Sequence, residues 1–219
     1  MTLIRSAKST GLALVAALGL FAQSKTAQAG SETLTVAGGC FWCVESDFES
    51  VKGVKEAISG FAGGKAVNPT YKQVTSGGTG HYEAVQIIFD PAVVSREKLL
   101  AKFFRSVDPT DAGGQFCDRG ASYRTAIFAD GSAQKAAAEK AKANAGKDLG
   151  QKIVTPILGA STFYPANASH QDYYKGNKIV LTRFGPKKQS KAYKAYRNAC
   201  GRDDRVKKLW GSAAPFVHG

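Results

Sequence analysis

The chain has 219 residues, of which 43% are hydrophobic and 21% charged. That balance fits one globular domain and excludes a disordered chain. The formal net charge of +13 would suit a nucleic-acid-binding protein, but the Lys and Arg residues are spread along the chain and no groove-reading motif accompanies them. The densest basic run, residues 187–197, is expected on the surface of a helix, where charge promotes solubility. We therefore expect no nucleic-acid partner.

The first 29 residues have the pattern of a secretory signal peptide. Arg5 and Lys8 form a basic start, and Ala27 and Ala29 are small residues at a cleavage site. The apolar run between them is shorter than the roughly 20 residues that a membrane-spanning helix needs. We expect cleavage after Ala29, a secreted or periplasmic location and no membrane contact afterwards. An uncleaved anchor or a buried helix is the alternative.

The mature part, residues 30–219, is expected to form one domain with a C-terminal tail from about residue 185. Hydrophobic periodicity predicts alternating strands and helices in it, without the regular period of a doubly wound fold. The predicted fold class is α+β, with a mixed β-sheet, helices packed on it in a ferredoxin-like two-layer core, and extended C-terminal loops and helix.

The predicted elements follow from the N-terminus onward. They are a strand at 34–37, a helix after Cys40, a Gly-rich connection at 60–64, a short helix between 68–70 and 77–78, a strand at 81–89, an amphipathic helix at 95–107, a strand at 123–129, an Ala/Lys helix at 132–149 with Ser132 as its N-cap, and a strand at 153–160. Beyond Phe163 we expect mostly loop and short helix, with residues 187–199 helical.

Four cysteines are present, namely Cys40, Cys43, Cys117 and Cys200. A secreted chain can use an even number of them as structural disulfides. However, Cys40 and Cys43 lie only three positions apart, a spacing that favours a redox or metal-binding role. Cys40 also falls where a strand passes into a helix, and a helix N-terminus lowers the pKa of a thiol there.

Phe41 and Trp42 follow Cys40 directly, and beside a nucleophile they fit the walls of an apolar pocket. The alternative is that both are core residues and that Cys40 is an inert buried thiol.

The stretch GGCFWCVE around Cys40 resembles the active-site signature of the A-type peptide methionine sulfoxide reductases. Three further stretches resemble later parts of that family in the right order: NPTYKQVTSGGTGHYEAVQIIFDP, DRGASYRTAIF and FYPANASHQDYY. The resemblance therefore runs from about Thr33 to Lys178. It implies that residues 30–219 form a catalytic domain that reduces methionine S-sulfoxide, in proteins or in free form.

The resemblance also implies a role for each site residue. Cys40 attacks the sulfoxide sulfur and becomes a sulfenic acid, Glu83 protonates the sulfoxide oxygen, Tyr71 and Tyr123 donate hydrogen bonds to it, Asp118 positions groups in the site, and Phe41 and Trp42 hold the S-methyl group. Each of these residues also has a structural alternative. Glu83 can be an exposed strand carboxylate, the two tyrosines can belong to the core edge, and Asp118 can cap a turn. His81 and His170 receive no role in the chemistry.

The sulfenic acid must condense with a second thiol, and the candidates are Cys200, Cys43 and Cys117. The family often has Asn at the position of Cys117, a small residue at that of Cys43, and recycling cysteines in a Gly-rich tail. Cys43 lies one helical turn from Cys40, Cys200 is expected on a mobile tail, and Cys117 adjoins Asp118. Our hypothesis is that Cys200 or Cys43 resolves the sulfenic acid first.

A thioredoxin-like reductant is expected to recycle the enzyme, and we expect a monomer with no cofactor and no metal. Two rival hypotheses stay open on the sequence. One is a thioredoxin-like disulfide oxidoreductase that uses Cys40 and Cys43, with Pro156 beside the site. The other is a structural zinc site formed by all four thiolates.

Overall fold

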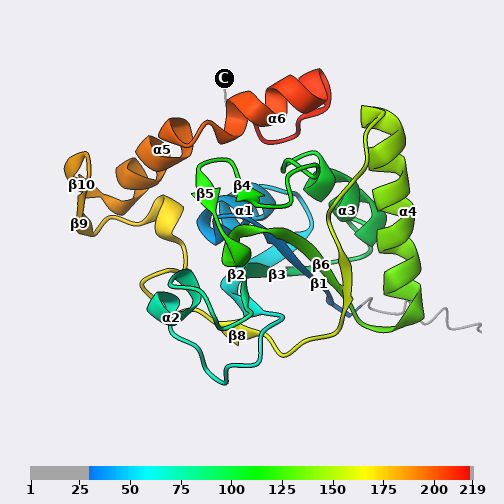
Figure 1. The fold of residues 1–219 in the computed structure, drawn as a ribbon, viewed down its shortest axis with the longest axis horizontal. Helices are drawn as coiled ribbons and strands as arrows, with labels where there is room; N and C mark the ends of the chain where they lie inside the picture. Colours follow the sequence, from blue (N-terminus) through cyan, green and yellow to red (C-terminus); the bar gives the residue numbers. More distant parts are fainter. Residues whose placement is uncertain (1–29, 218–219) are drawn as a thin grey trace, which may run out of the picture.

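The computed structural model describes residues 30–217, so the predicted signal peptide lies outside the described residues. Among these residues no helix combines the length and the apolar character that crossing a membrane requires. Figure 1 shows one mixed sheet with helices packed on it, as predicted, and two terminal helices that pass over one end of the sheet.

The described residues form a six-stranded sheet in the order β7-β6-β1-β3-β2-β8. Its strands are β1 (Glu32–Gly38), β2 (Val54–Ala62), β3 (Tyr82–Phe89), β6 (Thr125–Ala129), β7 (Ile157–Gly159) and β8 (Tyr164–Pro165). All neighbours pair antiparallel except β6 and β7, which are parallel. The four central strands, with one helix after β1 and another after β3, have the ferredoxin-like connectivity that the sequence predicts.

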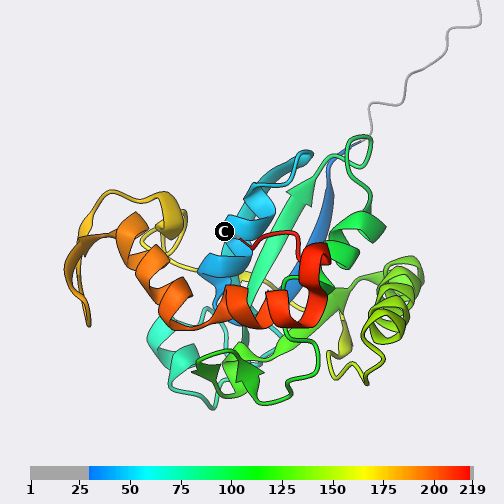
Figure 2. The same ribbon diagram turned by 90° about the horizontal axis from the view of Figure 1, so that it is seen from above.

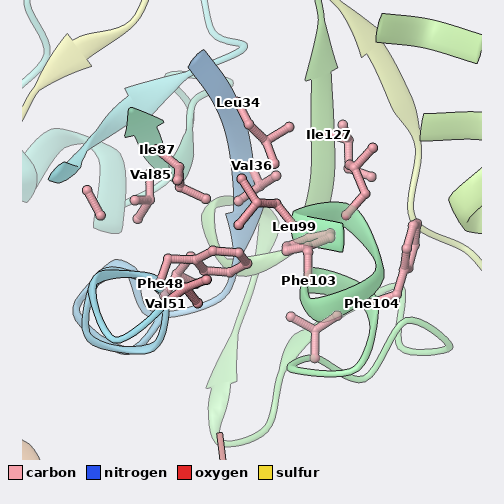
Figure 3. Close-up of a cluster of buried hydrophobic side chains, with 14 of the residues drawn as sticks. Leu34, Val36, Phe48, Val51, Val85, Ile87, Leu99, Phe103, Phe104 and Ile127 are labelled. Carbon is pink, nitrogen blue, oxygen red and sulfur yellow. The ribbon is translucent and has the colours of Figure 1, made fainter. Parts of the chain in front are cut away.

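The main core lies between one face of this sheet and two helices, α1 (Phe41–Glu49) and α3 (Arg96–Phe104). Figure 3 shows Leu34 and Ile127 of the sheet directed toward Leu99 and Phe103 of α3, with Phe48 of α1 beside them. These side chains are almost fully buried. Burying this apolar surface supplies the main driving force for folding and fixes the N-terminus of α1 against the sheet.

Several predicted elements are confirmed with small shifts. Helix α2 (Tyr71–Thr75) has Thr70 as its N-cap residue, whose side chain forms a capping box with Gln73. Helix α4 (Gly131–Leu149) packs beside α3, but its N-cap residue is Asp130 and not Ser132. The strand predicted at 153–160 is shorter, because only β7 pairs with the sheet.

Strand β2 is absent from the predicted elements, because its C-terminal half coincides with the Gly-rich stretch at 60–64. Gly60 lies inside β2, and a Cβ atom there would come within 2.4 Å of the Phe163 ring and 2.5 Å of the Tyr164 carbonyl oxygen. The glycine therefore allows β8 to approach β2 and does not mark a loop.

The C-terminal part also differs from the expectation of loops and a tail. Two strands, β9 (Ile179–Thr182) and β10 (Gly185–Lys188), form a separate hairpin, and helices α5 (Gln189–Ala199) and α6 (Arg202–Trp210) follow it. Lys187 and Lys188 consequently lie on a strand and not on a helix. In Figures 1 and 2 the hairpin stands at one end of the molecule and α4 at the other.

Two buried arginines attach these helices to the domain. Arg202 donates hydrogen bonds to the carbonyl oxygens of Gly38 (3.1 Å) and Ser106 (2.9 Å), and Arg197 forms an ion pair with Asp47 of α1 at 2.7 Å. Cys200, expected on a mobile tail, instead caps the C-terminus of α5. The two helices are thereby held over the start of α1.

Candidate active site

Cys40 is the N-cap residue of α1, at the junction of β1 and α1 that the sequence predicts. The backbone turns there at Gly39, which has a φ of +82°. A side chain at Gly39 would place its Cβ 2.6 Å from the Cβ of Gln115, so only glycine fits both the conformation and the space. Cys40 is half-buried and lies at the N-terminal end of the helix.

Glu83 lies directly beside this helix N-terminus. It is a β3 residue with 1% of its surface exposed, and its Oε2 accepts a hydrogen bond from the Phe41 N–H at 3.0 Å. Its other oxygen, Oε1, is buried without a hydrogen-bond partner among the described residues, and Glu83 lines the cavity together with Cys40. Burial raises the pKa of Glu83 to about 8. The carboxyl is therefore protonated at neutral pH and can act as an acid.

Tyr71 and Tyr123 lie on the same cavity as Glu83, although they come from different elements. Tyr71 is the first residue of α2, and Tyr123 ends a short 3-10 turn before β6. Burial, followed by the charge of Glu83, raises the pKa of both phenols. Both hydroxyls therefore stay protonated over the physiological range and act as hydrogen-bond donors.

Asp118 lines the cavity as predicted, on the short strand β5 (Asp118–Arg119), which pairs with β4 (Gly114–Gln115). Burial raises the pKa of this carboxyl. Its Oδ2 lies 3.9 Å from the sulfur of Cys200. Asp118 therefore contacts the wall of the cavity that the C-terminal helices supply.

An aromatic wall stands on the other side of Cys40. The Phe41 ring is buried and contacts the rings of Trp42, Phe61, Tyr71 and His170 at centroid distances of 5.6–6.1 Å. Phe41 is thus a core residue that also lines the cavity. The two alternatives given above, a pocket wall and a core residue, therefore both describe it.

Two further residues of this wall, Tyr173 and His170, have no role predicted from the sequence. Trp42 stacks flat on Tyr173, with ring centroids 3.8 Å apart, and His170 stacks on Tyr71 at 4.3 Å. Burial lowers the pKa of His170, so its ring is neutral near pH 7 and acts as a flat apolar surface. Both residues belong to the stretch FYPANASHQDYY, and its resemblance to the family was the one signal that could have indicated them.

A buried carboxylate holds this wall in place. Glu45 of α1 accepts hydrogen bonds from the Ser59 hydroxyl and from the Asp172 backbone N–H. Burial raises its pKa to about 7. Because Asp172 precedes Tyr173 directly, Glu45 fixes the loop that carries Tyr173 onto the helix that carries Trp42.

The four cysteines lie around one cavity but divide into two pairs. Cys117 and Cys200 form a disulfide, with their Cα atoms 4.9 Å apart. Cys40 and Cys43 are the free cysteines of the described residues. The disulfide removes two of the four thiolates that the zinc hypothesis requires.

The surroundings of the two free thiols shift their pKa values in opposite directions. The interaction with Cys43, burial and the charge of Glu83 when it is ionised raise the pKa of Cys40, contrary to the lowering expected from the helix N-terminus alone. The interaction with Cys40 lowers the pKa of Cys43, with further help from the charges of Arg202 and Arg197. In the substrate-free protein the negative charge is therefore favoured on Cys43.

The cavity has a volume of about 400 Å³ and an opening to solvent. It is lined by all seven predicted catalytic and substrate-binding residues, by the four cysteines, and by residues of the C-terminal segment: Tyr173, Leu181, Thr182, Tyr193, Tyr196, Arg197 and Arg202. A soft nucleophile, a protonated carboxyl and two hydroxyl donors meet here beside an apolar wall. This combination suits the transfer of an oxygen atom from a polarised sulfoxide to a thiol.

Comparisons with known proteins agree with this site. The family model described as peptide methionine sulfoxide reductase matches residues 32–212. The chain is 52% identical to peptide methionine sulfoxide reductase MsrA 2 of Rhizobium meliloti (strain 1021), over 81% of this chain and 83% of the relative. It is 48% identical to the MsrA of Listeria monocytogenes serotype 4b (strain CLIP80459), over 82% of this chain and 96% of the relative.

Solved structures give the same result. The methionine sulfoxide reductase A of Corynebacterium diphtheriae superposes with a TM-score of 0.64 at 32% identity, covering 72% of this chain and 80% of that one. Mxr1 from Saccharomyces cerevisiae in reduced form superposes with a TM-score of 0.63 at 30% identity, covering 67% of this chain and 86% of that one. The protein is therefore an oxidoreductase that belongs to the peptide methionine sulfoxide reductase family, of the MsrA type.

Proposed function

We propose that the protein repairs oxidised methionine by reducing the S epimer of methionine sulfoxide, free or within proteins, to methionine. The observation that carries this proposal is the convergence of Cys40, Glu83, Tyr71 and Tyr123 on one cavity. Family membership supports the substrate class. The S epimer follows from the resemblance of the motifs.

In the proposed reaction the Cys40 sulfur attacks the sulfoxide sulfur while Glu83 protonates the sulfoxide oxygen. Tyr71 and Tyr123 hydrogen-bond to the same oxygen and stabilise the charge that develops on it. The substrate S–O bond breaks, the oxygen ends on Cys40 as a sulfenic acid, and methionine leaves. The substrate sulfur gains two electrons and the Cys40 sulfur loses two. The proton lost by the Cys40 thiol balances the one that Glu83 gives.

Cys43 is our choice for the resolving thiol. It is free and lines the same cavity as Cys40, and the interaction with Cys40 and the charges of Arg202 and Arg197 favour its thiolate, which is the attacking form. Attack on the sulfenic acid forms a Cys40–Cys43 disulfide and releases water. Cys117 and Cys200, the other two candidates, are already bonded to each other.

A thioredoxin-like dithiol is the proposed reductant for this disulfide. Cys40 is the more exposed residue of the pair, so the reductant attacks its sulfur and Cys43 leaves as a thiolate. Because a thiol of lower pKa leaves faster, the arginines beside Cys43 favour this step as well. Exchange with the second thiol of the reductant then restores Cys40.

We propose further that the enzyme works outside the cytoplasm as a monomer, after cleavage following Ala29. The sequence pattern of residues 1–29 supports the location, and a single chain supplies every residue of the site described above. Finding the native protein in the periplasmic or extracellular fraction, with Gly30 as its first residue, is the expected result. A cytoplasmic protein with an intact N-terminus would contradict it.

Cys43→Ser gives the sharpest test of the chemistry. The variant should release about one methionine per enzyme and then stop, with a sulfenic acid at Cys40 that a dione reagent labels. The matched control Cys40→Ser should release none. Multiple turnover of Cys43→Ser at the wild-type rate with a dithiol reductant would exclude Cys43 as the resolver. Activity in Cys40→Ser would overturn the whole assignment.

A further inference from the structure

The hairpin formed by β9 and β10, together with α5, lies beside the mouth of the cavity. Leu181 and Thr182 of β9 line the cavity with Cys40, and Val180 packs against the cluster of Tyr173 and Tyr193. Figure 2 shows the hairpin standing out from the body of the molecule at the end opposite α4. We call residues 178–194, which make up this hairpin and the first part of α5, the arm.

The arm exposes an unusual amount of apolar surface. Leu181 is 86% exposed, Ile179 is 66% exposed and Phe184 is 39% exposed. Of the five large hydrophobic residues exposed in the described part of the chain, these three lie on the arm. Exposed apolar residues gathered beside a cavity are typical of a binding surface.

The arm is also strongly basic. Between Asp172 and Asp203 the sequence has nine Lys and Arg residues and no Asp or Glu. Two of them, Arg197 and Arg202, are buried, and Lys175 is paired with Glu49 and Asp172. The six that remain form no salt bridge within residues 30–217: Lys178, Arg183, Lys187, Lys188, Lys191 and Lys194. This positive charge therefore lies around the exposed apolar residues without an acidic partner in a salt bridge, although the Arg183 guanidinium lies over the rings of Phe184 and Tyr196.

The hairpin also has backbone groups at its edge with which a peptide could form hydrogen bonds. Leu181 lies opposite Pro186 in the register of the two strands. Because β9 and β10 form a two-stranded sheet of their own, one edge of β9 pairs with no other strand in the described part of the chain. An extended peptide can bind such a strand by adding to its edge, with alternate side chains resting on apolar neighbours.

We propose that the arm binds an extended, acidic segment of a substrate protein and presents its methionine sulfoxide to Cys40. The inference rests on the proposed function and names the class of protein substrate for the same site. Leu181 and Ile179 contact apolar side chains next to the sulfoxide, while Lys178, Lys187 and Lys188 attract Asp and Glu residues further along the segment. Acidic stretches exposed by unfolding or flexibility are therefore the preferred targets.

The test compares three substrates in single turnover without reductant, so that recycling plays no part. The substrates are N-acetyl methionine sulfoxide amide, a peptide with the sulfoxide flanked by Asp and Glu, and the same peptide with Lys at those positions. The measured quantity is the ratio of the second-order rate constant of single turnover for each peptide to that for the small amide, which does not depend on the fraction of folded protein. We expect the acidic peptide to exceed the basic one about tenfold at low ionic strength, with the difference shrinking as salt is added.

Two triple variants locate the effect. The arm variant Lys178→Gln, Lys187→Gln, Lys188→Gln should reduce the preference for the acidic peptide to about twofold or less. The matched control Lys135→Gln, Lys140→Gln, Lys147→Gln removes the same charge from α4, at the opposite end of the molecule, and should keep the wild-type ratio. Leu181→Ser should lower the ratio for both peptides.

Several results would overturn the proposal. Equal ratios for acidic and basic peptides would show that the arm does not select acidic segments. An equal loss in the α4 control would show that only the net charge matters. An unchanged peptide ratio in the arm variant, with a raised KM for the reductant in multiple turnover, would assign the arm to the reductant. If wild-type protein fails to reduce even the small amide, it is the proposed function that fails.

Discussion

Glu83→Gln tests the acid that the reaction requires. Glutamine keeps the shape of the side chain, and its oxygen can still accept the Phe41 N–H, but it cannot give a proton to the sulfoxide oxygen. Loss of a general acid slows a reaction by about 10²–10⁴-fold. We expect a decrease of that size in the single-turnover rate at pH 7, without loss of the fold.

The reaction rate should depend on pH through both Cys40 and Glu83. Wild-type activity needs Cys40 as a thiolate, which is favoured by rising pH, and Glu83 protonated, which is lost above its pKa of about 8. The rate should therefore follow a bell-shaped curve. The Glu83→Gln variant should lack the falling alkaline limb and keep only the rise that belongs to Cys40.

The free energy of unfolding should also depend on pH through the ionisation of Glu83. A pKa raised from 4.5 to about 8 in the folded state corresponds to about 5 kcal/mol of destabilisation once Glu83 is ionised. The protonated carboxyl carries no such penalty, so the free energy of unfolding is highest below pH 4.5 and falls as pH rises toward 8. Urea unfolding at pH 5, 7 and 9 should show this loss in wild type and not in Glu83→Gln. A variant with the wild-type rate, or with the same alkaline limb, would refute the assignment of Glu83 as the acid.

Further substitutions probe the other parts of the site. Tyr71→Phe and Tyr123→Phe should each slow single turnover about tenfold, since one hydrogen bond to the oxygen is worth about 1–1.5 kcal/mol; unchanged rates for both would remove the hydroxyls from the mechanism. Replacing Cys117 and Cys200 with Ser should lower the free energy of unfolding by about 2–4 kcal/mol while leaving the single-turnover rate within a few-fold, as measured by urea unfolding and methionine release. Arg197→Gln removes the 2.7 Å ion pair with buried Asp47 and leaves only the longer contact with Arg202 at 3.8 Å. It should cost about 3–5 kcal/mol of stability; a smaller loss in urea unfolding would show that Arg202 compensates for the lost partner.

The site residues near Cys40 could be predicted because local sequence determines them. A strand, two glycines and a helical pattern place Cys40 at a helix N-terminus from only about ten residues of sequence. The roles of Glu83 and Tyr123 came from resemblance, since no local pattern tells a buried acid from an exposed strand carboxylate. In the structure the part of β3 around Glu83 is buried on both faces, so only 1% of the Glu83 surface is exposed.

What the sequence could not predict depends on contacts between distant residues. Arg197 and Asp47 are 150 positions apart, and Cys117 and Cys200 are 83 apart. No periodicity links such positions, so neither the pairing of the cysteines nor the docking of α5 could be read from one chain. The expected lowering of the Cys40 pKa was wrong for the same reason, because it considered the helix N-terminus without Cys43, Glu83 and burial.

Disulfide mapping by mass spectrometry after a single turnover tests the proposed catalytic cycle with one observation. Reduced wild-type enzyme, with Cys117–Cys200 left intact, is mixed with one equivalent of methionine sulfoxide and no reductant. The proposed cycle predicts one methionine per enzyme and one new disulfide, between Cys40 and Cys43. A Cys40 disulfide with Cys200 or Cys117 would contradict the choice of resolver, and methionine formation with Cys40 still a free thiol would contradict the mechanism itself.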